Sequence, residues 1–340
     1  MKNLRKITAV LLVAVLLCGL AACGKAPAEQ PETEALKHIT VSLDWTPNTN
    51  HTGLYVALAN GYYADAGLDV SIVQPPEDDA IAACSAGQVE FAVGYQDLLA
   101  AGFVSDTPME VTAVAALLQH NSSCIISKQG EGMDRPKGLE GKEFLTWESP
   151  IELAMMENVV TNDGGDWSQV QLIPNTVTDE AQDVNVNPSH AIWVYYGWSV
   201  INAQVNDVAV DSFFFKDINP VFDYYSPVLV ANNALLQNDP ETVKAFLEAT
   251  KKGYEFAIEN PEQAAQILIA GDDTGSLVGS EDLVIASQQY MANEYKAEVE
   301  QWGYIDAARW NAFYQWLNDE HLVAKDLPMD TYFTNDFLAQ

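Results

Sequence analysis

Aromatic side chains stand beside carboxylates, amides or hydroxyls at five points of the sequence. The five groups are Asp44-Trp45-Thr46-Pro47-Asn48, Tyr95-Gln96-Asp97, Trp147-Glu148-Ser149, Tyr196-Gly197-Trp198 and Asp223-Tyr224-Tyr225. An aromatic side chain can stack on a flat ligand ring, and a neighbouring carboxylate or amide can hydrogen-bond the polar edge of that ring. Each aromatic residue taken alone could equally pack beneath a loop, so it is the repeated pairing that indicates a binding site.

These residue types favour a neutral or weakly cationic heterocycle. A 4-aminopyrimidine presents an amine donor beside a ring-nitrogen acceptor, and a carboxylate that shares a proton with that nitrogen binds both groups with charge assistance. After the first 22 residues the arginines are Arg135 and Arg309, and neither lies in the five groups. A sulfonate, nitrate or phosphate normally requires an arginine clamp, although a helix N-terminus at Ser149 could hold an anion without one.

Common catalytic motifs are missing from the sequence. Ala83-Cys84-Ser85-Ala86-Gly87 lacks the first glycine of a GxSxG elbow, and there is no P-loop and no clean GxGxxG. The histidines, at positions 38, 51, 120, 190 and 321, show no HExxH or paired spacing, and the cysteines show no zinc spacing. We therefore expect no catalytic residue, no metal ligand and no cofactor.

Alternating strands and helices must position the five groups. The patterns predict strands over 38–43, 68–73, 89–94 and 111–118, with helices over 53–60 and 79–86, and then strands over 142–145, 169–173 and 191–196. Ser149-Pro150-Ile151-Glu152 has the form of a capping box with proline at N1, so a helix begins there. This alternation predicts α/β units with parallel sheets. Ligands bind at the carboxyl ends of the strands in such sheets, where the five groups are expected to lie.

The C-terminal third is predicted to be helical, over 245–258, 262–269, 283–295 and 307–317. Asp239-Pro240 and Asn260-Pro261 each place a capping residue before a proline at N1. The aromatic residues of this region are expected to pack in the core: Trp302, Trp310, Phe313, Tyr314 and Trp316. Two β-rich segments, 123–127 and 227–231, are expected to cross between two α/β units, and 340 residues suit about two domains.

The first 22 residues have the pattern of a secretory signal, with Lys2, Arg5 and Lys6 before an apolar run over 7–17. That run is shorter than the ~20 residues of a membrane span. Leu20-Ala21-Ala22-Cys23 resembles a bacterial lipobox, whose cysteine carries a diacylglycerol and anchors the chain stably. The alternatives are a plain signal peptide or a transmembrane anchor. Residues 23–37, rich in Ala, Pro and Glu, are predicted to form a flexible tether.

Charge and cysteine usage bound the function further. The chain has 16 basic and 48 acidic residues, a net charge of −32, and removal of the three basic residues of the signal makes it −35. Nucleic acid is excluded as a partner because phosphate contacts need a basic face. With Cys18 in the signal and Cys23 lipidated, Cys84 and Cys124 remain. In an exported protein they could form a disulfide or stay as two buried thiols.

Several of these motifs also carry a family resemblance. The run Leu43-Asp44-Trp45-Thr46-Pro47-Asn48-Thr49-Asn50-His51-Thr52-Gly53 resembles the opening motif of ABC-transporter solute-binding proteins for thiamine pyrimidine precursors. That family is related to the fungal pyrimidine synthases of thiamine biosynthesis. The similarity continues through Pro76-Glu77-Asp78, Gly94-Tyr95-Gln96, Gln119-His120-Asn121, Trp147-Glu148-Ser149, Tyr195-Tyr196-Gly197-Trp198 and Asp223-Tyr224-Tyr225.

This resemblance implies an α/β type II periplasmic-binding-protein fold, with two lobes that close over a ligand cleft through hinge crossovers. Lobe 1 would comprise 38–126 and 228–340, and lobe 2 would comprise 127–227. The implied function is the solute-binding component of an ABC importer, which captures formylaminopyrimidine or hydroxymethylpyrimidine and delivers it to a permease and its ATPase. The chain would be an extracytoplasmic monomer, anchored to the cell membrane through Cys23.

The resemblance also assigns roles to individual residues. Trp45 and an aromatic side chain of the opposite lobe would sandwich the ring, while Asp44, Asn48 and Glu148 would bind its edge. The remaining members of the expected pocket are Tyr95, Trp147, Ser149, Tyr196, Trp198, Asp223 and Tyr224. Taurine, another sulfonate or a flavin-like heterocycle such as riboflavin are alternative ligands. A pyrimidine synthase is disfavoured, because this sequence has no cysteine near Asp223 to match the cysteine-rich loop of the fungal enzymes.

Overall fold

Two five-stranded sheets organise the chain, and the computed structural model describes residues 35–76 and 79–338. The predicted signal, Cys23 and most of the predicted tether lie outside these residues. Lys37 already belongs to the first strand, so the folded part begins one residue before the predicted boundary. Among the described residues, no helix is both long and apolar enough to cross a membrane.

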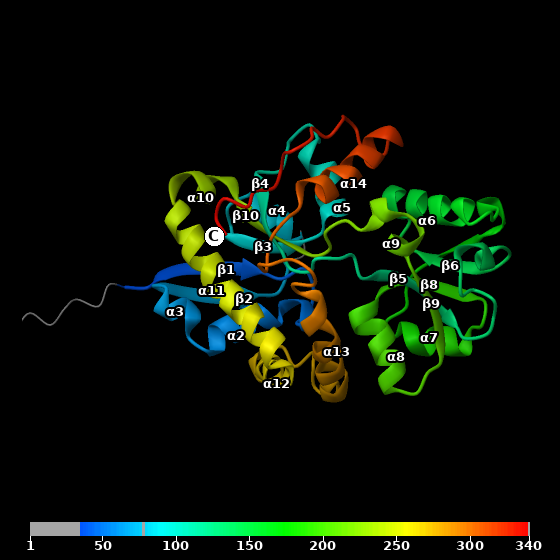
Figure 1. Cartoon of the computed structure of the whole chain (residues 1–340), viewed down its shortest axis with the longest axis horizontal. Helices are drawn as coiled ribbons and strands as arrows, with labels where there is room; N and C mark the ends of the chain where they lie inside the picture. The colour runs from blue at the N-terminus through cyan, green and yellow to red at the C-terminus, as the bar shows by residue number, and fades with distance from the viewer. Residues whose placement is uncertain (1–34, 77–78, 339–340) are drawn as a thin grey trace, which may run out of the picture. The chain divides into compact units, whose positions relative to one another are not determined.

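The first sheet has the strand order β2-β1-β3-β10-β4. Its members are β1 (Lys37–Ser42), β2 (Leu68–Val73), β3 (Phe91–Gly94), β4 (Val111–Ala116) and β10 (Val228–Asn232). β3 and β10 are buried along their whole length, as expected of strands covered on both faces. Figure 1 shows the labels of these strands gathered on one side of the picture.

The second sheet has the order β7-β6-β8-β5-β9. It contains β5 (Ser123–Lys128), β6 (Glu143–Thr146), β7 (Gln171–Pro174), β8 (His190–Tyr195) and β9 (Val210–Phe214). β9 was not expected from the sequence. β5 lies wholly in this sheet, so the lobe boundary expected between 126 and 127 falls inside a strand. The division of the chain into lobes stays a prediction.

The prediction of purely parallel sheets is wrong, because both sheets are mixed. β10 pairs antiparallel with β3 and β4, and β5 pairs antiparallel with β8 and β9. These are the two strands predicted to cross between the units. Along the chain, β5 comes after four strands of the first sheet but belongs to the second, and β10 comes after the strands of the second sheet but belongs to the first. Each of these two strands runs antiparallel to its neighbours.

Helices connect the strands as the sequence predicts. Around the first sheet they are η1 (Thr49–His51), α2 (Thr52–Ala59), α3 (Tyr62–Asp65), α4 (Ala80–Ser85), α5 (Gln96–Phe103), α10 (Asn233–Asn238), α11 (Pro240–Glu259), α12 (Pro261–Gly271), α13 (Glu281–Glu294) and α14 (Ala307–Asp319). Around the second they are η2 (Pro136–Leu139), α6 (Pro150–Asn162), η3 (Trp167–Gln169), α7 (Glu180–Val186), η4 (Tyr196–Val200), α8 (Ile201–Val205), α9 (Phe215–Ile218) and η5 (Pro220–Phe222).

Two glycines allow α2 and α11 to meet closely. A β-carbon added at Gly53 would lie 2.2 Å from the ring of Tyr254, and one added at Gly253 would lie 2.0 Å from the carbonyl oxygen of Gly53. No side chain fits at those distances. The Tyr254 hydroxyl donates to the carbonyl oxygen of Asn50 at 2.6 Å, so this contact also fixes η1, the turn that follows the first aromatic group.

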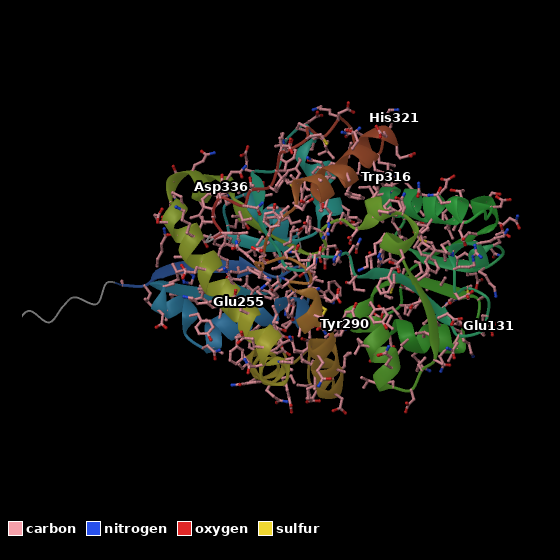
Figure 2. All side chains as sticks on the ribbon, viewed as in Figure 1. Glu131, Glu255, Tyr290, Trp316, His321 and Asp336 are labelled. Atoms are coloured by element: carbon pink, nitrogen blue, oxygen red, sulfur yellow. The ribbon has the colours of Figure 1, made fainter. Side chains whose placement is uncertain are left out.

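The aromatic residues of the C-terminal third lie in the core, as predicted. Trp302, Trp310, Phe313 and Tyr314 are fully buried, and Trp316 is nearly so. Figure 2 labels Trp316 on α14. Cys84 and Cys124 are buried free thiols, which is the second of the two alternatives left open by the sequence.

Candidate functional site

Asp44 follows β1 and is held by two donors. Its Oδ1 atom lies 2.6 Å from Nε2 of His51, and its Oδ2 atom accepts from the Tyr95 hydroxyl. Nδ1 of His51 accepts from the backbone N–H of Asn48 at 3.2 Å, which places the imidazole proton on Nε2, toward Asp44. Burial alone would raise the pKa of Asp44, but His51 and Tyr95 hold that pKa below its usual value.

Trp45 and Asn48 complete the loop after β1. The Trp45 side chain is 68 % exposed, which is unusual for the largest apolar residue. Asn48 is the N-cap of η1: its side chain accepts from the N–H of Asn50 at 2.9 Å and donates to the carbonyl oxygen of Thr46 at 3.0 Å. The loop therefore has a fixed backbone, an immobilised carboxylate and an exposed indole. The roles predicted for Trp45 and Asn48 in ligand binding stay predictions.

Tyr95 connects the two sheets. It directly follows β3, and its ring stacks on Tyr195 at the end of β8, with centroids 5.9 Å apart and planes 19° apart. Burial raises the pKa of both hydroxyls, and the neighbouring Asp44 and Asp97 carboxylates raise both further. Tyr195 is therefore a site candidate from the second sheet that was not predicted from the sequence, although it precedes the predicted Tyr196.

Asp97 lies in the first turn of α5, two residues beyond Tyr95. Its buried Oδ1 atom has no hydrogen-bond partner among the described residues. Burial raises the pKa of this carboxyl to about 6, although the nearby N–H groups of Asp97 and Leu98 and the Tyr224 hydroxyl act in the opposite direction. A carboxyl with such a pKa can exchange a proton near neutrality.

The loop after β6 exposes an indole on a rigid support. Trp147 is 54 % exposed and its ring lies 6.1 Å from that of buried Trp193. Glu152 accepts from the Thr146 hydroxyl at 2.8 Å and from the backbone N–H groups of Trp147 and Ser149 at 3.1 and 3.3 Å. Ser149 is the N-cap of α6, as predicted. Glu152 thus holds the loop that presents Trp147.

Glu148 occupies the most unusual backbone position of this loop. Its φ is +60°, a conformation that L residues rarely adopt, and its backbone N–H donates to the Thr146 hydroxyl at 2.8 Å. The residue is exposed. The positive φ fixes the direction in which the Glu148 side chain leaves the backbone. The predicted contact of Glu148 with a ligand stays a prediction.

Tyr196 and Trp198 lie in η4, a short π-helix after β8. Tyr196 packs between Phe214 and Tyr290, with centroid distances of 5.2 and 5.0 Å, and Trp198 is half-buried against the core cluster around the first sheet. Figure 2 labels Tyr290 on α13, at the side of that helix toward α8. Both predicted aromatics therefore make packing contacts, and their contact with a ligand stays a prediction.

Asp223 lies at the crossovers between the sheets. Its Oδ2 atom is 2.7 Å from Nδ1 of His120, and its Oδ1 atom accepts from the N–H of Asn121 at 3.0 Å. His120 and Asn121 stand between β4 and β5, while Asp223 precedes β10, so these bonds join the two crossover segments. Hydrogen bonding to Asp223 raises the pKa of His120 despite its partial burial.

Arg309, which lies outside the five groups in the sequence, stands beside one of them in the fold. Its Nε atom lies 3.8 Å from Asp223 Oδ2, and its guanidinium lies over the ring of Tyr225, 5.4 Å from the centroid. Arg309 comes from α14, 86 positions along the chain from Asp223, so sequence proximity gave no sign of the contact. Glu298 accepts from both Arg309 and His120, at 3.2 and 2.8 Å.

Tyr224 is the most enclosed of the predicted site residues. Its ring is 2 % exposed and stacks on Phe313 with centroids 4.0 Å apart. Burial and the charge of Asp97 raise the pKa of its hydroxyl far above the usual value. Among residues 35–76 and 79–338 no cluster of three or more potential metal ligands occurs.

The structure therefore brings together residues from several predicted groups. The charges of Asp44 and Asp97 both raise the pKa of Tyr95, and the charge of Asp97 also raises the pKa of Tyr224. Trp45 and Trp147, in contrast, stand exposed on separate loops. Sequence reasoning missed His51, Tyr195 and His120 as partners of site residues. His51 lies inside the first motif, seven positions after Asp44, and that spacing across a tight turn was the available signal.

The chain is similar in sequence both to binding proteins and to pyrimidine phosphate synthases. The family described as "NMT1/THI5 like" matches residues 48–264. The chain is 30 % identical to a formylaminopyrimidine-binding protein of Halalkalibacterium halodurans, over 93 % of this chain and 96 % of that one. It is 24 % identical to the riboflavin-binding protein RibY of Chloroflexus aurantiacus, over 99 % of both. A yeast 4-amino-5-hydroxymethyl-2-methylpyrimidine phosphate synthase, THI11, is 20 % identical over 66 % of this chain and 68 % of that one.

Solved structures show the same fold. A putative periplasmic sulfonate-binding protein of an ABC transporter, SsuA from Methylobacillus flagellatus, superposes with a TM-score of 0.64 at 14 % identity, over 89 % of this chain and 93 % of that one. The aliphatic sulphonate-binding protein SsuA of Escherichia coli gives 0.62 at 14 % identity, over 86 % and 95 %. The expected two-lobe α/β fold of periplasmic binding proteins is thus confirmed.

Proposed function

The chain belongs to the NMT1/THI5-like family, and from that premise we propose that it is the extracytoplasmic solute-binding component of an ABC importer for a thiamine pyrimidine precursor. Formylaminopyrimidine and hydroxymethylpyrimidine are the proposed ligands. The relative from Halalkalibacterium halodurans supports the first of these, since it is named for formylaminopyrimidine and is similar along nearly the whole chain.

One observation carries the proposal: a preorganised carboxylate stands beside an exposed indole at the carboxyl end of β1. Trp45 is 68 % exposed, while the adjacent Asp44 is fixed by His51 and Tyr95. Stacking of a flat ring on an aromatic side chain contributes about 1–3 kcal/mol. An indole left in water beside an immobilised hydrogen-bonding group is suited to a flat, polar-edged ligand.

A cluster of half-buried polar side chains that includes this carboxylate supports the same conclusion. Four residues share two properties there: Asp44, Tyr95, Asp97 and Tyr195. Each keeps some surface accessible to water, yet burial is the largest influence on the pKa of each. A few partly buried polar groups together with an exposed aromatic side chain are typical of the residues that line a ligand site.

Capture requires the two sheets to move about their crossovers. We expect the ring to stack on Trp45 first and an aromatic residue of the second sheet, such as Trp147, to cover it on closure. The contacts of Asp223 with His120 and Asn121 join the crossovers, so they are placed to act as the hinge of such a motion. Closure would then present one defined form to the permease.

Two other ligands have a specific observation in their favour. The riboflavin-binding relative matches 99 % of the chain, and a flavin is also a flat ring with a polar edge. A sulfonate is favoured only by Arg309, whose guanidinium is already paired with Asp223 and Glu298. A pyrimidine synthase is less favoured, because the fungal-type relative matches two thirds of the chain at 20 % identity.

The proposed location follows from the N-terminal pattern. A lipid on Cys23 would tether the protein, as a monomer, outside the membrane that holds the permease. Metabolic labelling with a radioactive fatty acid checks this part, and loss of label in Cys23→Ala is the expected result. Label retained by that variant would contradict it.

The ligand itself is tested by mass spectrometry of the protein purified under native conditions. The expected finding is a retained pyrimidine with a 4-amino group, released on denaturation. A retained flavin or sulfonate would contradict the proposed specificity while leaving the binding-protein class intact.

A further inference from the structure

Helix α13 contacts elements that stand around both sheets. It packs on η1, α11 and α12, which accompany the first sheet, and also on η4 and α8, which accompany the second. Figure 1 labels α13 between α12 and α8. Because η1 follows β1 and η4 follows β8, α13 joins the ends of two strands that belong to different sheets. This junction is separate from the two crossover segments.

Two hydrogen bonds pass through α13 at Ser287. The Ser287 hydroxyl donates to the carbonyl oxygen of Gly197 in η4, so its single proton is used there. The Thr49 hydroxyl must then be the donor to Ser287, with the two oxygens 2.7 Å apart. Both side chains are buried. The bonds therefore lead from η1, the turn that Asn48 caps after Trp45, across α13 to the second sheet.

η4 and α13 also approach each other closely at Gly197. A β-carbon added there would lie 2.5 Å from Sδ of Met291 and 3.3 Å from the ring of Tyr290. The neighbouring Tyr196 packs on Tyr290, with ring centroids 5.0 Å apart, and Figure 2 labels Tyr290 on α13. A π-helical turn such as η4 is rare and frequently occurs at functional sites. The contact thus depends on a residue without a side chain and on the Ser287 hydroxyl.

We propose that Ser287 is a positioning residue whose bond to Gly197 latches the two sheets in the arrangement that encloses the ligand. Ser287 acts through η1 and η4, the turns that follow β1 and β8, and not by contact with the ligand. This inference rests on the proposed function and deepens it, since it names the contact that holds the closed form.

The latch acts on the balance between an open and a closed form. When the sheets part, water replaces Ser287 at the Gly197 carbonyl, so the bond contributes to the closed form alone and shifts the balance toward it. The apparent affinity for a ligand falls in proportion to the fraction of chains in the form that binds it. The bond from Thr49 joins elements around the first sheet, so it persists on opening and keeps the Ser287 hydroxyl aimed at Gly197.

Double electron–electron resonance between spin labels at Gln263→Cys on α12 and Val205→Cys on α8 measures the separation of the two sides without any ligand. Both positions are exposed. Ser287→Ala is expected to add a population at longer distance, and so is Gly197→Ala, whose β-carbon displaces η4 from α13. Saturating 4-amino-5-hydroxymethyl-2-methylpyrimidine should restore the wild-type distance. Calorimetry should show an affinity about 3- to 10-fold weaker in Ser287→Ala, as expected for one hydrogen bond.

Ser199→Ala is the matched control. Ser199 is a buried serine of the same turn, but its hydroxyl donates at 3.3 Å to Glu180, within the elements around the second sheet. This variant should keep the wild-type distances and affinity, and thermal unfolding checks that each variant is folded. Wild-type distances in Ser287→Ala and Gly197→Ala overturn the latch while the proposed function stands. If the wild type binds no pyrimidine, the proposed function is wrong, and the distances in the unliganded protein decide the latch alone.

Discussion

Tyr95 and Tyr195 stack on each other across the two sheets, with ring centroids 5.9 Å apart and planes 19° apart. The first tyrosine directly follows β3, and the second is the last residue of β8. Through the Tyr95 hydroxyl the stack reaches Asp44, and through its charge Asp97 acts on both rings. This contact between the sheets lies beside the Asp44 carboxylate that is proposed to face the ligand, so we expect movement of the sheets and ligand binding to be coupled.

Trp45→Ala should weaken pyrimidine binding by about 10- to 100-fold, because it removes a stacking contact of about 1–3 kcal/mol. The fold should be unaffected, since the side chain is 68 % exposed. Calorimetric titration measures the affinity and thermal unfolding checks the fold. Trp45→Phe should recover most of the affinity, and Val278→Ala, at another exposed apolar position, should change neither quantity. Unchanged affinity in Trp45→Ala would show that the ring does not stack there.

His51→Ala should lower the free energy of unfolding at pH 7 by about 2–4 kcal/mol, because it leaves buried Asp44 without one of its two donors. The pKa of Asp44 is lowered in the folded protein, so its stabilising contribution is present above the unfolded pKa and is lost as pH falls through the folded pKa. The difference between variant and wild type should therefore shrink below about pH 4. Urea denaturation across this range measures it.

A matched control for His51 is His38→Ala. His38 pairs with Asp69 at 3.2 Å, but both side chains are more than 60 % exposed. Exposed pairs of this kind contribute little, so no measurable change is expected. Equal losses in the two variants would mean that the buried contact with Asp44 is not what His51 supplies.

His120→Gln should change the pH dependence of stability in the opposite direction. The pKa of His120 is raised by Asp223, so its contribution is fully present below its unfolded pKa and is lost as pH rises through the folded pKa. The free energy of unfolding of the wild type should exceed that of the variant at pH 6 by about 0.2–1 kcal/mol, the range of partly exposed ion pairs, and the two should converge under mildly alkaline conditions. A difference that is constant from pH 6 to pH 9 would contradict the ionic part of this contact.

Glu152→Ala should lower the free energy of unfolding by about 2–3 kcal/mol, because it leaves the buried Thr146 hydroxyl and the part-buried N–H groups of Trp147 and Ser149 without their acceptor. The loop that presents Trp147 should also loosen, so ligand affinity should fall. Denaturation and titration of one preparation measure both effects. Glu157→Ala, at an exposed position of the same helix, is the control and should alter neither. If the Glu152→Ala variant is destabilised but binds the ligand with normal affinity, Trp147 does not contribute to ligand binding.

Asp97→Asn should stabilise the unliganded protein at pH 8 by about 1–3 kcal/mol. Because burial raises the pKa of Asp97 to about 6, the unfolded state ionises at lower pH than the folded state, and stability is lost as the pH rises from about 4 to about 6. Wild type and variant should thus be nearly equal at pH 4 and diverge toward pH 8. Unfolding midpoints across this range measure the divergence, and a variant less stable than wild type at pH 8 would contradict it.

Local sequence patterns predicted most of the helices and strands, whereas the direction in which strands pair depends on contacts between distant parts of the chain. The capping box at Ser149 and the strand over 68–73 depend on neighbouring residues, and the structure shows both. The direction of β5 and β10 in their sheets depends on which sheet each strand enters, which no local pattern records. β9 is only half-buried along most of its length, which weakens the alternation that marks a strand.

The candidate site shows the same limit. Composition and position identified Asp44 and Tyr95, but not that they bond each other across 51 positions. The partners of the site residues come from other elements: Tyr195 of the second sheet stacks on Tyr95, and Arg309 of α14 pairs with Asp223. Which carboxylate oxygens are paired is therefore a property of tertiary structure: both oxygens of Asp44 have partners, whereas the buried Oδ1 atom of Asp97 has none among the described residues.

Calorimetric titration of the native protein with formylaminopyrimidine, beside riboflavin and taurine, tests the central claim most directly. Saturable binding of one pyrimidine per chain, with no heat from riboflavin or taurine, is the predicted result. No heat from the pyrimidine, together with clear binding of riboflavin or taurine, would contradict it.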